Sequence, residues 1–247
     1  MHTQQDNKPV YIILGATGGI GAELSRILAR QGAHLVLAAR HEDRLHSLAY
    51  ELNADYRAVD ATSIDEVDTC VKEAMDKYGT VSGIANCVGS ILLKPAHLTS
   101  EQEWLDTITL NLNTAFAAVR AAGKHMRRSG GSVVLIASAA AQVGLANHEA
   151  IAAAKGGVIG LTRSAAATYA PKIRVNCVAP GLVDTPLAGR ITSNESALKS
   201  SQSMHPMQRI GTPNDIAAPM AWLLDPNTSW VTGQAINIDG GLSTVRV

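Results

Sequence analysis

An apolar strand that runs straight into a glycine-rich turn is the feature of this sequence that most restricts its fold. Five consecutive large apolar residues, Val10–Leu14, are followed by G-A-T-G-G-I-G at positions 15–21. Apolar residues then recur at the spacing of one helix face, at Ile20, Leu24, Ile27 and Leu28. The continuous run is typical of a buried strand, and the later spacing is typical of an amphipathic helix. The segment therefore predicts a strand, a tight turn and the start of a helix.

This turn has the properties of a pyrophosphate-binding site. Gly15, Gly19 and Gly21 let the backbone turn sharply and approach a ligand closely. The first N–H groups of the helix would then face the anion, with the positive end of the helix dipole behind them. The spacing lacks the G-K-[ST] ending with which P-loops bind triphosphates and magnesium. A dinucleotide is favoured, with a simple turn as the alternative.

Length and charge favour one domain that acts on a small molecule. The 247 residues are 46% hydrophobic, and no Pro/Ser-rich or strongly charged stretch marks a linker. One α/β domain is the simpler prediction. Because 21 Lys and Arg residues balance 21 Asp and Glu residues, we expect neither nucleic acid nor a membrane as partner.

The cysteines and the N-terminal residues favour a cytoplasmic protein. Cys70, Cys87 and Cys177 are odd in number and widely spaced, so neither disulfides nor a metal site is indicated. The start M-H-T-Q-Q-D-N-K-P lacks an apolar signal core, and no run of about 18 apolar residues could span a membrane. We expect a soluble protein with a flexible segment at 1–8.

Strand and helix patterns alternate along the whole chain. The predicted strands are Val10–Leu14, Ala33–Ala38, Tyr56–Val59, Val81–Cys87, Ser132–Ala137, Arg174–Val178 and Ala235–Ile238. The predicted helices after the first are His41–Asn53, Ile64–Tyr78, Glu101–Arg128, His148–Tyr169 and Pro213–Leu224, and Leu187–Arg209 is predicted to be irregular. Short connections in such an alternation require crossovers, so we expect an α/β fold: a three-layer, doubly wound parallel sheet.

Ligands bind to such sheets outside the carboxyl ends of the strands. Four segments that follow predicted strands are therefore candidates for the site. They are Gly15–Gly21, Asn86–Gly89, Ser138 and Pro180–Thr185.

Together with the glycine turn, several motifs make the chain resemble the short-chain dehydrogenase/reductase family over nearly its whole length. These motifs are Asp60, N-C-V-G at 86–89, Asn111, Ser138, Lys155, P-G-L-V-D-T at 180–185 and T-G-Q-A-I-N-I-D-G-G at 232–241. The resemblance implies a single Rossmann domain that binds NAD or NADP and assembles as a homo-oligomer, a tetramer or dimer. The cofactor-binding residues that it implies are Gly15, Thr17, Gly19, Ile20, Gly21, Arg40, Asp60, Ala61, Asn86, Gly89, Lys155, Pro180, Gly181, Val183 and Thr185.

The resemblance also implies active-site roles for three residues. Ser138 would hydrogen-bond the substrate oxygen, Lys155 would bind the ribose hydroxyls, and Asn111 would hold a water in a proton relay. Their structural alternatives are a turn residue, a solvated lysine and a helix cap or kink. The small apolar residues around Lys155 favour a buried stem that reaches a ribose.

One departure from the family pattern affects the chemistry. The family carries a tyrosine general acid four residues before the lysine and about thirteen after the serine, and both counts lead to Ile151. A positioned general acid contributes roughly 10²–10⁴ in rate, and isoleucine supplies none of it. Ordinary reduction of a ketone or oxidation of an alcohol should be slow unless another donor substitutes. The departures at Leu14 and in N-C-V-G are tolerable.

Three explanations of the missing tyrosine stay open. His148, seven residues before Lys155, matches a wider spacing that resembles the enoyl-thioester reductases of the superfamily, and imidazole donates protons near neutral pH. His148 and the adjacent Glu149 are otherwise ordinary helix-start residues. Alternatively, hydride addition to an activated C=C bond forms an enolate that needs a stabilised oxygen and a later proton from water; some dienoyl-thioester reductases also lack this tyrosine. The third explanation is a catalytically silent sensor or scaffold.

The end of the second strand bears on the choice of dinucleotide. An acidic residue there would hold the ribose 2′-hydroxyl of NAD, but Ala39 stands there and Arg40 follows. An arginine can bind the 2′-phosphate of NADP through paired, charge-assisted hydrogen bonds. We therefore expect NADP, with NAD as the alternative and a solvated Arg40 as the structural explanation.

The polar, serine-rich segment Leu187–Arg209 lies where the family has its substrate lid. We expect it to be mobile before a ligand binds. Met204 and Met207 would line an adaptable apolar pocket or make core contacts.

Overall fold

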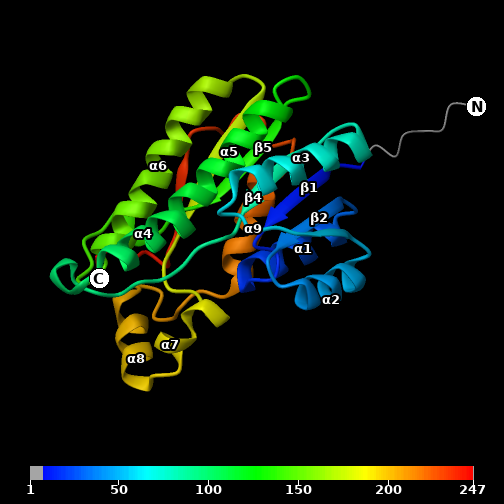
Figure 1. Ribbon diagram of the computed structural model, residues 1–247. Helices are drawn as coiled ribbons and strands as arrows, with labels where there is room; N and C mark the ends of the chain where they lie inside the picture. The colour runs from blue at the N-terminus through cyan, green and yellow to red at the C-terminus, as the bar shows by residue number, and fades with distance from the viewer. Residues whose placement is uncertain (1–7, 247) are drawn as a thin grey trace, which may run out of the picture.

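A single parallel β-sheet forms the centre of the computed structural model, which describes residues 8–246 (Figure 1). Its strands are β1 (Val10–Leu14), β2 (His34–Ala39), β3 (Asp55–Ala58), β4 (Gly83–Asn86), β5 (Gly131–Ile136), β6 (Ile173–Pro180) and β7 (Ala235–Ile238). They pair in the order β3-β2-β1-β4-β5-β6-β7, and every pair is parallel. All but the last residue of the segment predicted to be flexible, 1–8, lies outside the described residues.

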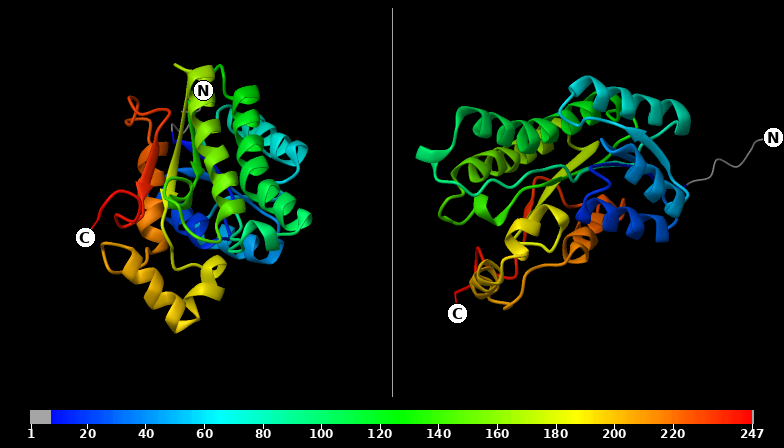
Figure 2. Two further views of the ribbon diagram at one scale, coloured as in Figure 1. Left: turned by 90° about the vertical axis from the view of Figure 1, so that its left-hand side faces the viewer. Right: turned by 60° about the horizontal axis from the view of Figure 1, so that its bottom comes forward.

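Helices pack on both faces of this sheet. They are α1 (Gly19–Arg30), α2 (Glu42–Leu52), α3 (Ile64–Tyr78), α4 (Glu101–Ile108), α5 (Thr114–His125), α6 (Glu149–Tyr169), α7 (Gly189–Thr192), α8 (Glu195–Met204) and α9 (Pro213–Leu224). Helices α3, α5 and α6 cover one face, and α1, α2 and α9 cover the other (Figure 2). The predicted single, doubly wound α/β domain with three layers is confirmed.

Strand β1 illustrates how the sheet separates two hydrophobic cores. Ile12 and Leu14 belong to the core beneath α3, α5 and α6, whereas Tyr11 and Ile13 belong to the core beneath α1, α2 and α9. Successive strand residues point to opposite faces, so a strand covered on both sides needs an apolar residue at every position. The unbroken apolar run of β1 follows from this two-sided burial.

The chain reverses its direction across the sheet next to β1. Strands β2 and β3 extend the sheet to one side of β1, and β4 returns to the other side. Leu14 pairs with Asn86, and Asn86 pairs with Leu135, so the loops after β1, β4 and β5 begin at the same level. Such a switch point is where open α/β sheets bind their ligands.

The predicted helix Glu101–Arg128 is interrupted in the structure. Helix α4 ends at Ile108, a π-helical turn spans Thr109–Asn113, and α5 then ends at His125. In this turn Asn111 Nδ2 donates a hydrogen bond of 2.9 Å to the carbonyl oxygen of Thr107. In a regular α-helix the backbone N–H of residue 111 would take that place. The interruption escaped prediction because one inserted residue hardly changes the apolar spacing.

The prediction that Leu187–Arg209 is irregular is wrong. Helices α7 and α8 lie within it and form a projection at the bottom of Figure 1. Helix α8 begins after Asn194, whose side-chain oxygen accepts a hydrogen bond of 2.9 Å from the N–H of Ala197. Ser201 is the only buried residue of α8. A helix so exposed has no apolar stripe for periodicity to detect.

No helix in the described part of the chain, residues 8–246, has both the length and the apolar character needed to cross a bilayer.

Candidate functional site

A groove of about 350 Å³ lies at the carboxyl end of β1. The turn after β1, the end of β2, the loops after β3 and β4, and residues 185–187 form its walls. The residues proposed for the cofactor that line it are Gly15, Thr17, Gly19, Ile20, Arg40, Asp60, Ala61, Gly89 and Thr185. The structure thus brings together segments that are far apart in the sequence.

Three glycines of the turn have no room for a side chain or adopt a conformation that disfavours one. Gly15 has a φ of +76°, a conformation that L side chains rarely adopt. A Cβ at Gly19 would lie 2.8 Å from the Thr185 methyl group, and one at Gly21 would collide with the Gly15 carbonyl oxygen. Helix α1 starts at Gly19 with no side-chain cap and no acidic residue in its first turn. Its N–H groups are therefore available to an anion in the groove.

Gly21 and Asn86 support the groove without lining it. Gly21 permits close packing within the turn, as described above. Asn86 is buried; its Nδ2 donates to Thr114 Oγ1 at 3.1 Å and its Oδ1 accepts from the N–H of Val88 at 3.2 Å. It thereby shapes the loop after β4, whose Gly89 does reach the groove.

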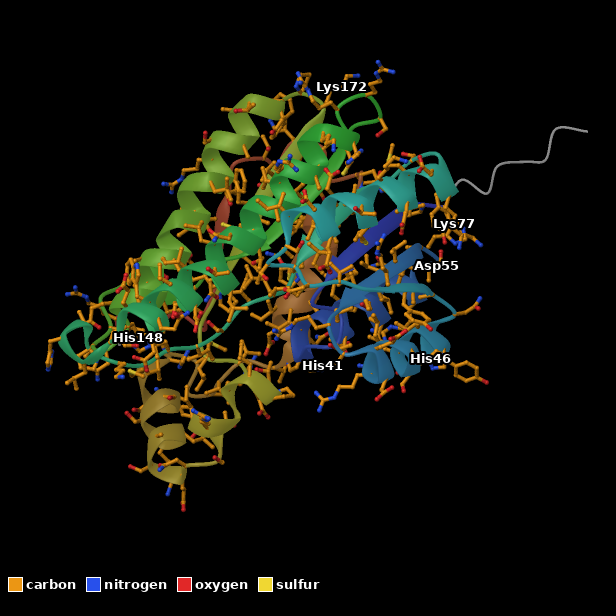
Figure 3. The ribbon with its side chains drawn as sticks, in the orientation of Figure 1. His41, His46, Asp55, Lys77, His148 and Lys172 are labelled. Carbon is orange, nitrogen blue, oxygen red and sulfur yellow. The ribbon has the colours of Figure 1, made fainter. Side chains whose placement is uncertain are left out.

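Two exposed arginines line the end of the groove near β2. Arg40 follows β2 as predicted, and Arg44 lies in the first turn of α2. Arg44 was not predicted from the sequence. Its position four residues after Arg40, within the helix predicted to begin at His41, could have indicated that the two arginines lie close together. His41 lies between them and also lines the groove (Figure 3).

Asp60 lines the same groove as a carboxylate. Its Oδ1 accepts hydrogen bonds from the backbone N–H of Thr62 at 3.0 Å and from the Thr62 hydroxyl at 2.8 Å. These bonds, with a smaller contribution from the charge of Arg40, hold the pKa of Asp60 below its usual value. An ionised acceptor therefore faces the groove at neutral pH.

A smaller cavity of about 140 Å³ adjoins the groove. Ser138, Lys155 and Asn111, the three residues given active-site roles, all line it, and Ile151 lines it too. The predicted cofactor residues Pro180, Gly181, Val183 and Thr185 also line it. The two hollows are neighbours, because they share the lining residues Ile20, Cys87, Val88, Gly89, Thr185 and Leu187.

Lys155 is buried on α6, with 5% of its surface exposed. Its Nζ donates a hydrogen bond of 2.8 Å to the carbonyl oxygen of Ile136, at the end of β5. Burial disfavours the charged form and lowers the Lys155 pKa to about 8, against a small opposing effect of Cys177 and Cys87. The solvated alternative for this lysine is therefore wrong.

Asn111 and Ser90 bind each other reciprocally at the cavity wall. Asn111 Oδ1 accepts from the backbone N–H of Ser90 at 3.1 Å, and Asn111 Nδ2 donates to Ser90 Oγ at 2.9 Å. Gly89 makes this approach possible, because a Cβ there would lie 2.9 Å from Asn111 Oδ1 and 3.4 Å from Lys155 Nζ. Ser90 also lines the cavity. The sequence reasoning missed it, since a single serine after a family motif carries no signal.

Ser138 leaves β5 in an extended conformation and caps the short 3₁₀ turn Ala139–Ala141. Its Oγ accepts a hydrogen bond of 3.2 Å from the N–H of Ala140. A hydroxyl that accepts in this way keeps its own proton for donation. The residue is thus a turn former whose hydroxyl also lines the cavity.

His148 and Glu149 lie outside the cavity. The His148 Nδ1 is 2.7 Å from the Ala146 carbonyl oxygen, and the ring is not part of the described cavity lining. Glu149 accepts a long hydrogen bond of 3.4 Å from the N–H of Ala96 and lines a different surface hollow. Figure 3 shows His148 at the start of α6, far from His41 at the groove. The structure therefore does not bring the predicted alternative acid to Lys155.

The two methionines of the 187–209 segment also miss the cavity. Met204 is half-exposed and Met207 is 65% exposed, so the interpretation as core contacts is wrong. Met207 lines a separate hollow beside β7. From this segment only Leu187 and Ala188 reach the cavity. Within residues 8–246 no group of three or more His, Cys, Asp or Glu residues is arranged to hold a metal ion.

Comparison with known proteins agrees with this geometry. Residues 15–243 match the family model described as enoyl-(acyl carrier protein) reductase. The chain belongs to the short-chain dehydrogenase/reductase family. That family membership makes it an NAD(P)-dependent oxidoreductase in class.

Three relatives illustrate the similarity. The 3-oxoacyl-[acyl-carrier-protein] reductase FabG of Thermotoga maritima is 32% identical, with 94% of this chain and 97% of that protein covered. Trans-4-hydroxycyclohexanecarboxylate dehydrogenase of Sinomonas cyclohexanicum is 33% identical, with 94% and 92% covered. A solved structure, that of a tyrosine-to-phenylalanine variant of ElxO with NADPH bound, superposes with a TM-score of 0.90. Its sequence is 30% identical, and the match covers 96% of this chain and 100% of that chain.

The hollows fit the nicotinamide dinucleotide that such a family uses. The glycine turn and the start of α1 offer N–H groups to a pyrophosphate, and the arginines stand at one end of the groove. The neighbouring cavity has Lys155 in its wall. The two hollows together extend from residues near Arg40 to residues near Ser138.

Proposed function

We propose that this protein is an NADP-preferring oxidoreductase with altered proton chemistry, which acts on a small carbonyl compound, alcohol or activated C=C bond. The observation that carries the proposal is the lining of the smaller cavity, which we call the inner cavity. Ser138, Lys155 and Asn111 line it, and an aliphatic Ile151 lies one helical turn before the lysine. Ile151 takes the place of the family's acidic tyrosine.

The arginines support the preference for NADP. A 2′-phosphate carries negative charge to the end of the groove where Arg40 and Arg44 lie. Guanidinium groups bind phosphates through paired, charge-assisted hydrogen bonds. Asp60, the carboxylate of the described groove lining, follows β3 rather than β2, and one of its two oxygens accepts the hydrogen bonds from Thr62.

The residues that line the inner cavity have different proposed roles in binding and catalysis. A bound nicotinamide supplies or accepts the hydride. Lys155 holds the ribose hydroxyls, and Ser138 donates its free hydroxyl proton to the substrate oxygen, where negative charge develops. Asn111 has both amide protons engaged, with Ser90 and Thr107. Its proposed role is therefore to shape the wall rather than to hold the water of a proton relay.

Ile151 affects the substrate class. Without the tyrosine at position 151, reduction of a simple ketone loses roughly 10²–10⁴ in rate unless another group donates the proton. An activated C=C bond suffers less, because its enolate needs chiefly a stabilised oxygen and takes its carbon proton later. We therefore propose enones or enoyl thioesters as better substrates than simple ketones.

Cofactor binding is tested by calorimetric titration with NADPH and NADH. We expect tighter binding of NADPH, and we expect Arg44→Ala to weaken NADPH binding by about tenfold, since charge-assisted hydrogen bonds contribute about 1.5–3 kcal/mol. NADH binding should be unchanged in this variant. Arg128→Ala removes an exposed arginine outside the groove and is the matched control. Equal affinities for both dinucleotides would contradict the preference.

Catalysis is tested with a panel of ketones, alcohols and enoyl thioesters, with Ile151→Tyr measured in parallel. Restoring the phenol should raise ketone reduction by roughly 10²-fold or more. Fast ketone turnover by the wild type, with no gain in Ile151→Tyr, would contradict the proposed role of Ile151.

A catalytically silent, dinucleotide-binding protein is the second candidate. It is favoured by the absence of Tyr, His, Asp and Glu from the described lining of the inner cavity. The NADPH-bound ElxO variant, in which a tyrosine is replaced by phenylalanine, supports binding without that phenol. Binding of NADPH without turnover of any panel member would select this candidate.

A further inference from the structure

We propose that the ammonium group of Lys155 is itself the proton donor of the inner cavity, passing its proton to the substrate oxygen directly or through one water. This inference rests on the proposed function and adds a role for Lys155 beyond holding a ribose. Three independent properties of the described residues carry it: the chemistry of the lining, the position of the lysine and its environment.

The lining contains no other group that can release a proton near neutral pH. Its hydroxyl residues are Ser90, Ser138 and Thr185, and alcohols are far weaker acids than ammonium groups. The one other titratable side chain of the described lining is Cys87, and burial raises the pKa of its thiol to about 12. A thiol with that pKa transfers its proton too rarely to serve as general acid.

The position of Lys155 gives its ammonium access to the cavity. Ile151 precedes it by one helical turn, so both side chains lie on the same face of α6 and both line the cavity. An isoleucine offers neither a donor nor an acceptor there. The Ile136 carbonyl oxygen takes one of the three ammonium protons. The other two are available to a ribose hydroxyl and to the substrate oxygen or a water.

Gly89 keeps side-chain atoms away from one side of the ammonium. A Cβ on this glycine would lie 3.4 Å from Lys155 Nζ, in van der Waals contact with the amine. The loop after β4 therefore carries no side chain at this position. Both hollows include Gly89 in their lining, which places the amine near their junction.

The surroundings of the ammonium group favour release of its proton. Burial lowers the Lys155 pKa to about 8. The charged or titratable groups that face it are the Cys87 and Cys177 thiols, both with pKa values raised by burial and hence neutral. No carboxylate in the described lining retains the proton. The amine is thus protonated at pH 7 yet close to its point of release, as an efficient acid should be.

For a carbonyl substrate, the carbonyl carbon would receive a hydride, with its electron pair, which a bound reduced nicotinamide would supply and thereby be oxidised. The π electrons of the C=O bond move to the oxygen while the N–H bond of Lys155 breaks and an O–H bond forms. The lysine is left as a neutral amine and regains a proton from solvent. For an enone the same proton goes to the enolate oxygen.

The first experiment observes the lysine without turnover. In protein labelled with ¹³C-lysine, the Cε resonance of Lys155 is identified by its loss in Lys155→Arg and titrated by NMR, with and without NADP⁺. We expect a midpoint near pH 8 for Lys155, well below the ordinary range of lysine. A midpoint above about pH 10, the ordinary range of lysine, would overturn the proposal.

The second experiment compares the pH dependence of kcat for reduction by the wild type and Lys155→Arg. Arginine keeps a charge and several donors but does not release its proton in this pH range. In the wild type, kcat should fall about tenfold per pH unit above the midpoint seen by NMR, because the acid is lost. Lys155→Arg should still bind NADPH, lose about a hundredfold in kcat and show no falling limb. Lys172→Arg is the control for a conservative change at an exposed lysine and should behave as the wild type.

The outcomes separate this inference from the proposed function. The role of Lys155 as proton donor is refuted if the kcat of Lys155→Arg still falls at high pH as in the wild type, or if this variant loses less than about tenfold in kcat. Either result leaves the proposed oxidoreductase function intact. Absence of turnover by the wild type with every substrate removes both. If Lys155→Arg does not fold, the Cε resonance of Lys155 is assigned instead by its loss in Lys155→Met. The NMR titration of the wild type then decides the question.

Discussion

Gly89 controls how closely polar side chains approach one another at the cavity wall. A Cβ at this position would lie 2.9 Å from Asn111 Oδ1, a separation that real Cβ atoms essentially never show. Asn111 is held by Ser90 and Thr107 and cannot move without losing hydrogen bonds. A single methyl group here therefore disturbs a buried polar pair, the kind of change that is costly in proteins.

We predict that Gly89→Ala lowers the free energy of unfolding by about 1–3 kcal/mol, since it displaces a buried, hydrogen-bonded amide. NADPH affinity should fall as well, because Gly89 lines both hollows. Urea denaturation and calorimetry measure the two effects. Gly160→Ala is the control: a Cβ there meets open space in α6, and alanine favours helix by about 1 kcal/mol over glycine. Equal stability of the two variants would contradict this interpretation.

Lys155 should make stability depend on pH in an unusual direction. Its folded-state pKa of about 8 lies below the ordinary 10.5, so the unfolded chain binds the proton more tightly. The burial penalty is complete below pH 8 and is relieved as the pH rises toward 10.5. The shift corresponds to about 3 kcal/mol.

We therefore predict that the free energy of unfolding of the wild type, relative to that of Lys155→Met, rises by about 3 kcal/mol between pH 7.5 and 10.5. Guanidinium chloride denaturation at a series of pH values measures the difference. Its absolute value also contains the lost bond to Ile136, so the slope with pH is the decisive quantity. A flat difference would mean that Lys155 titrates as an ordinary lysine.

At the scale of elements, helix α8 is connected to the sheet through one buried histidine. His205 directly follows α8; its Nδ1 donates to the Ser201 carbonyl oxygen at 2.6 Å, and its Nε2 accepts from the N–H of Leu182 at 3.3 Å. Leu182 lies in the loop after β6 and lines the inner cavity. The ring thus couples the projecting helices to the wall of the site.

We predict that His205→Ala increases hydrogen exchange across residues 189–204 and weakens substrate binding, because both of these hydrogen bonds are lost. Loss of a buried pair of this kind costs about 1–3 kcal/mol locally. Exchange measured by mass spectrometry reports the effect, and Met204→Ala, at a half-exposed side chain of α8, is the neighbouring control. Unchanged exchange in α8 would show that other contacts hold this segment.

For the whole molecule, the large apolar side chains exposed on the surface include two regions with aromatic residues, one on α4 and α5 and one on and after α9. Trp104, Leu105 and Phe116 are exposed on α4 and α5, and Trp222 and Trp230 are exposed on α9 and in the loop before β7, with Trp230 99% exposed. Exposed aromatic residues of this kind mark protein interfaces. They support the proposed homo-oligomer.

We predict a dimer or tetramer by size-exclusion chromatography with light scattering. If both regions are interfaces, the protein is a tetramer, and Trp230→Ser and Phe116→Ser should each reduce it to a dimer. If only one region forms an interface, the wild type is a dimer, and only the variant in that region should dissociate to a monomer. A monomeric wild type at micromolar concentration would contradict the prediction.

Local patterns in the sequence were sufficient for the fold. Apolar runs such as Val10–Leu14 and the alternation of strand and helix require a parallel sheet, because short crossovers allow little else. The same patterns failed for α8, whose exposed face carries no periodicity, and for the π-helical turn at Asn111, which leaves the apolar spacing nearly unchanged. Periodicity reports burial, so elements with little burial escape it.

The sequence by itself determined the doubly wound architecture and the glycine turn, because these depend on local spacing along strands and helices, and the family resemblance of its motifs pointed to Ser138, Lys155 and Ile151. Only the tertiary structure decided that Ser90 pairs with Asn111, that Arg44 joins Arg40, and that His148 stays away from the cavity. Ser90 and Asn111 are 21 residues apart and meet only through packing. The walls that Arg44 lines and His148 misses are likewise formed by segments from different parts of the chain, which packing across the sheet brings together.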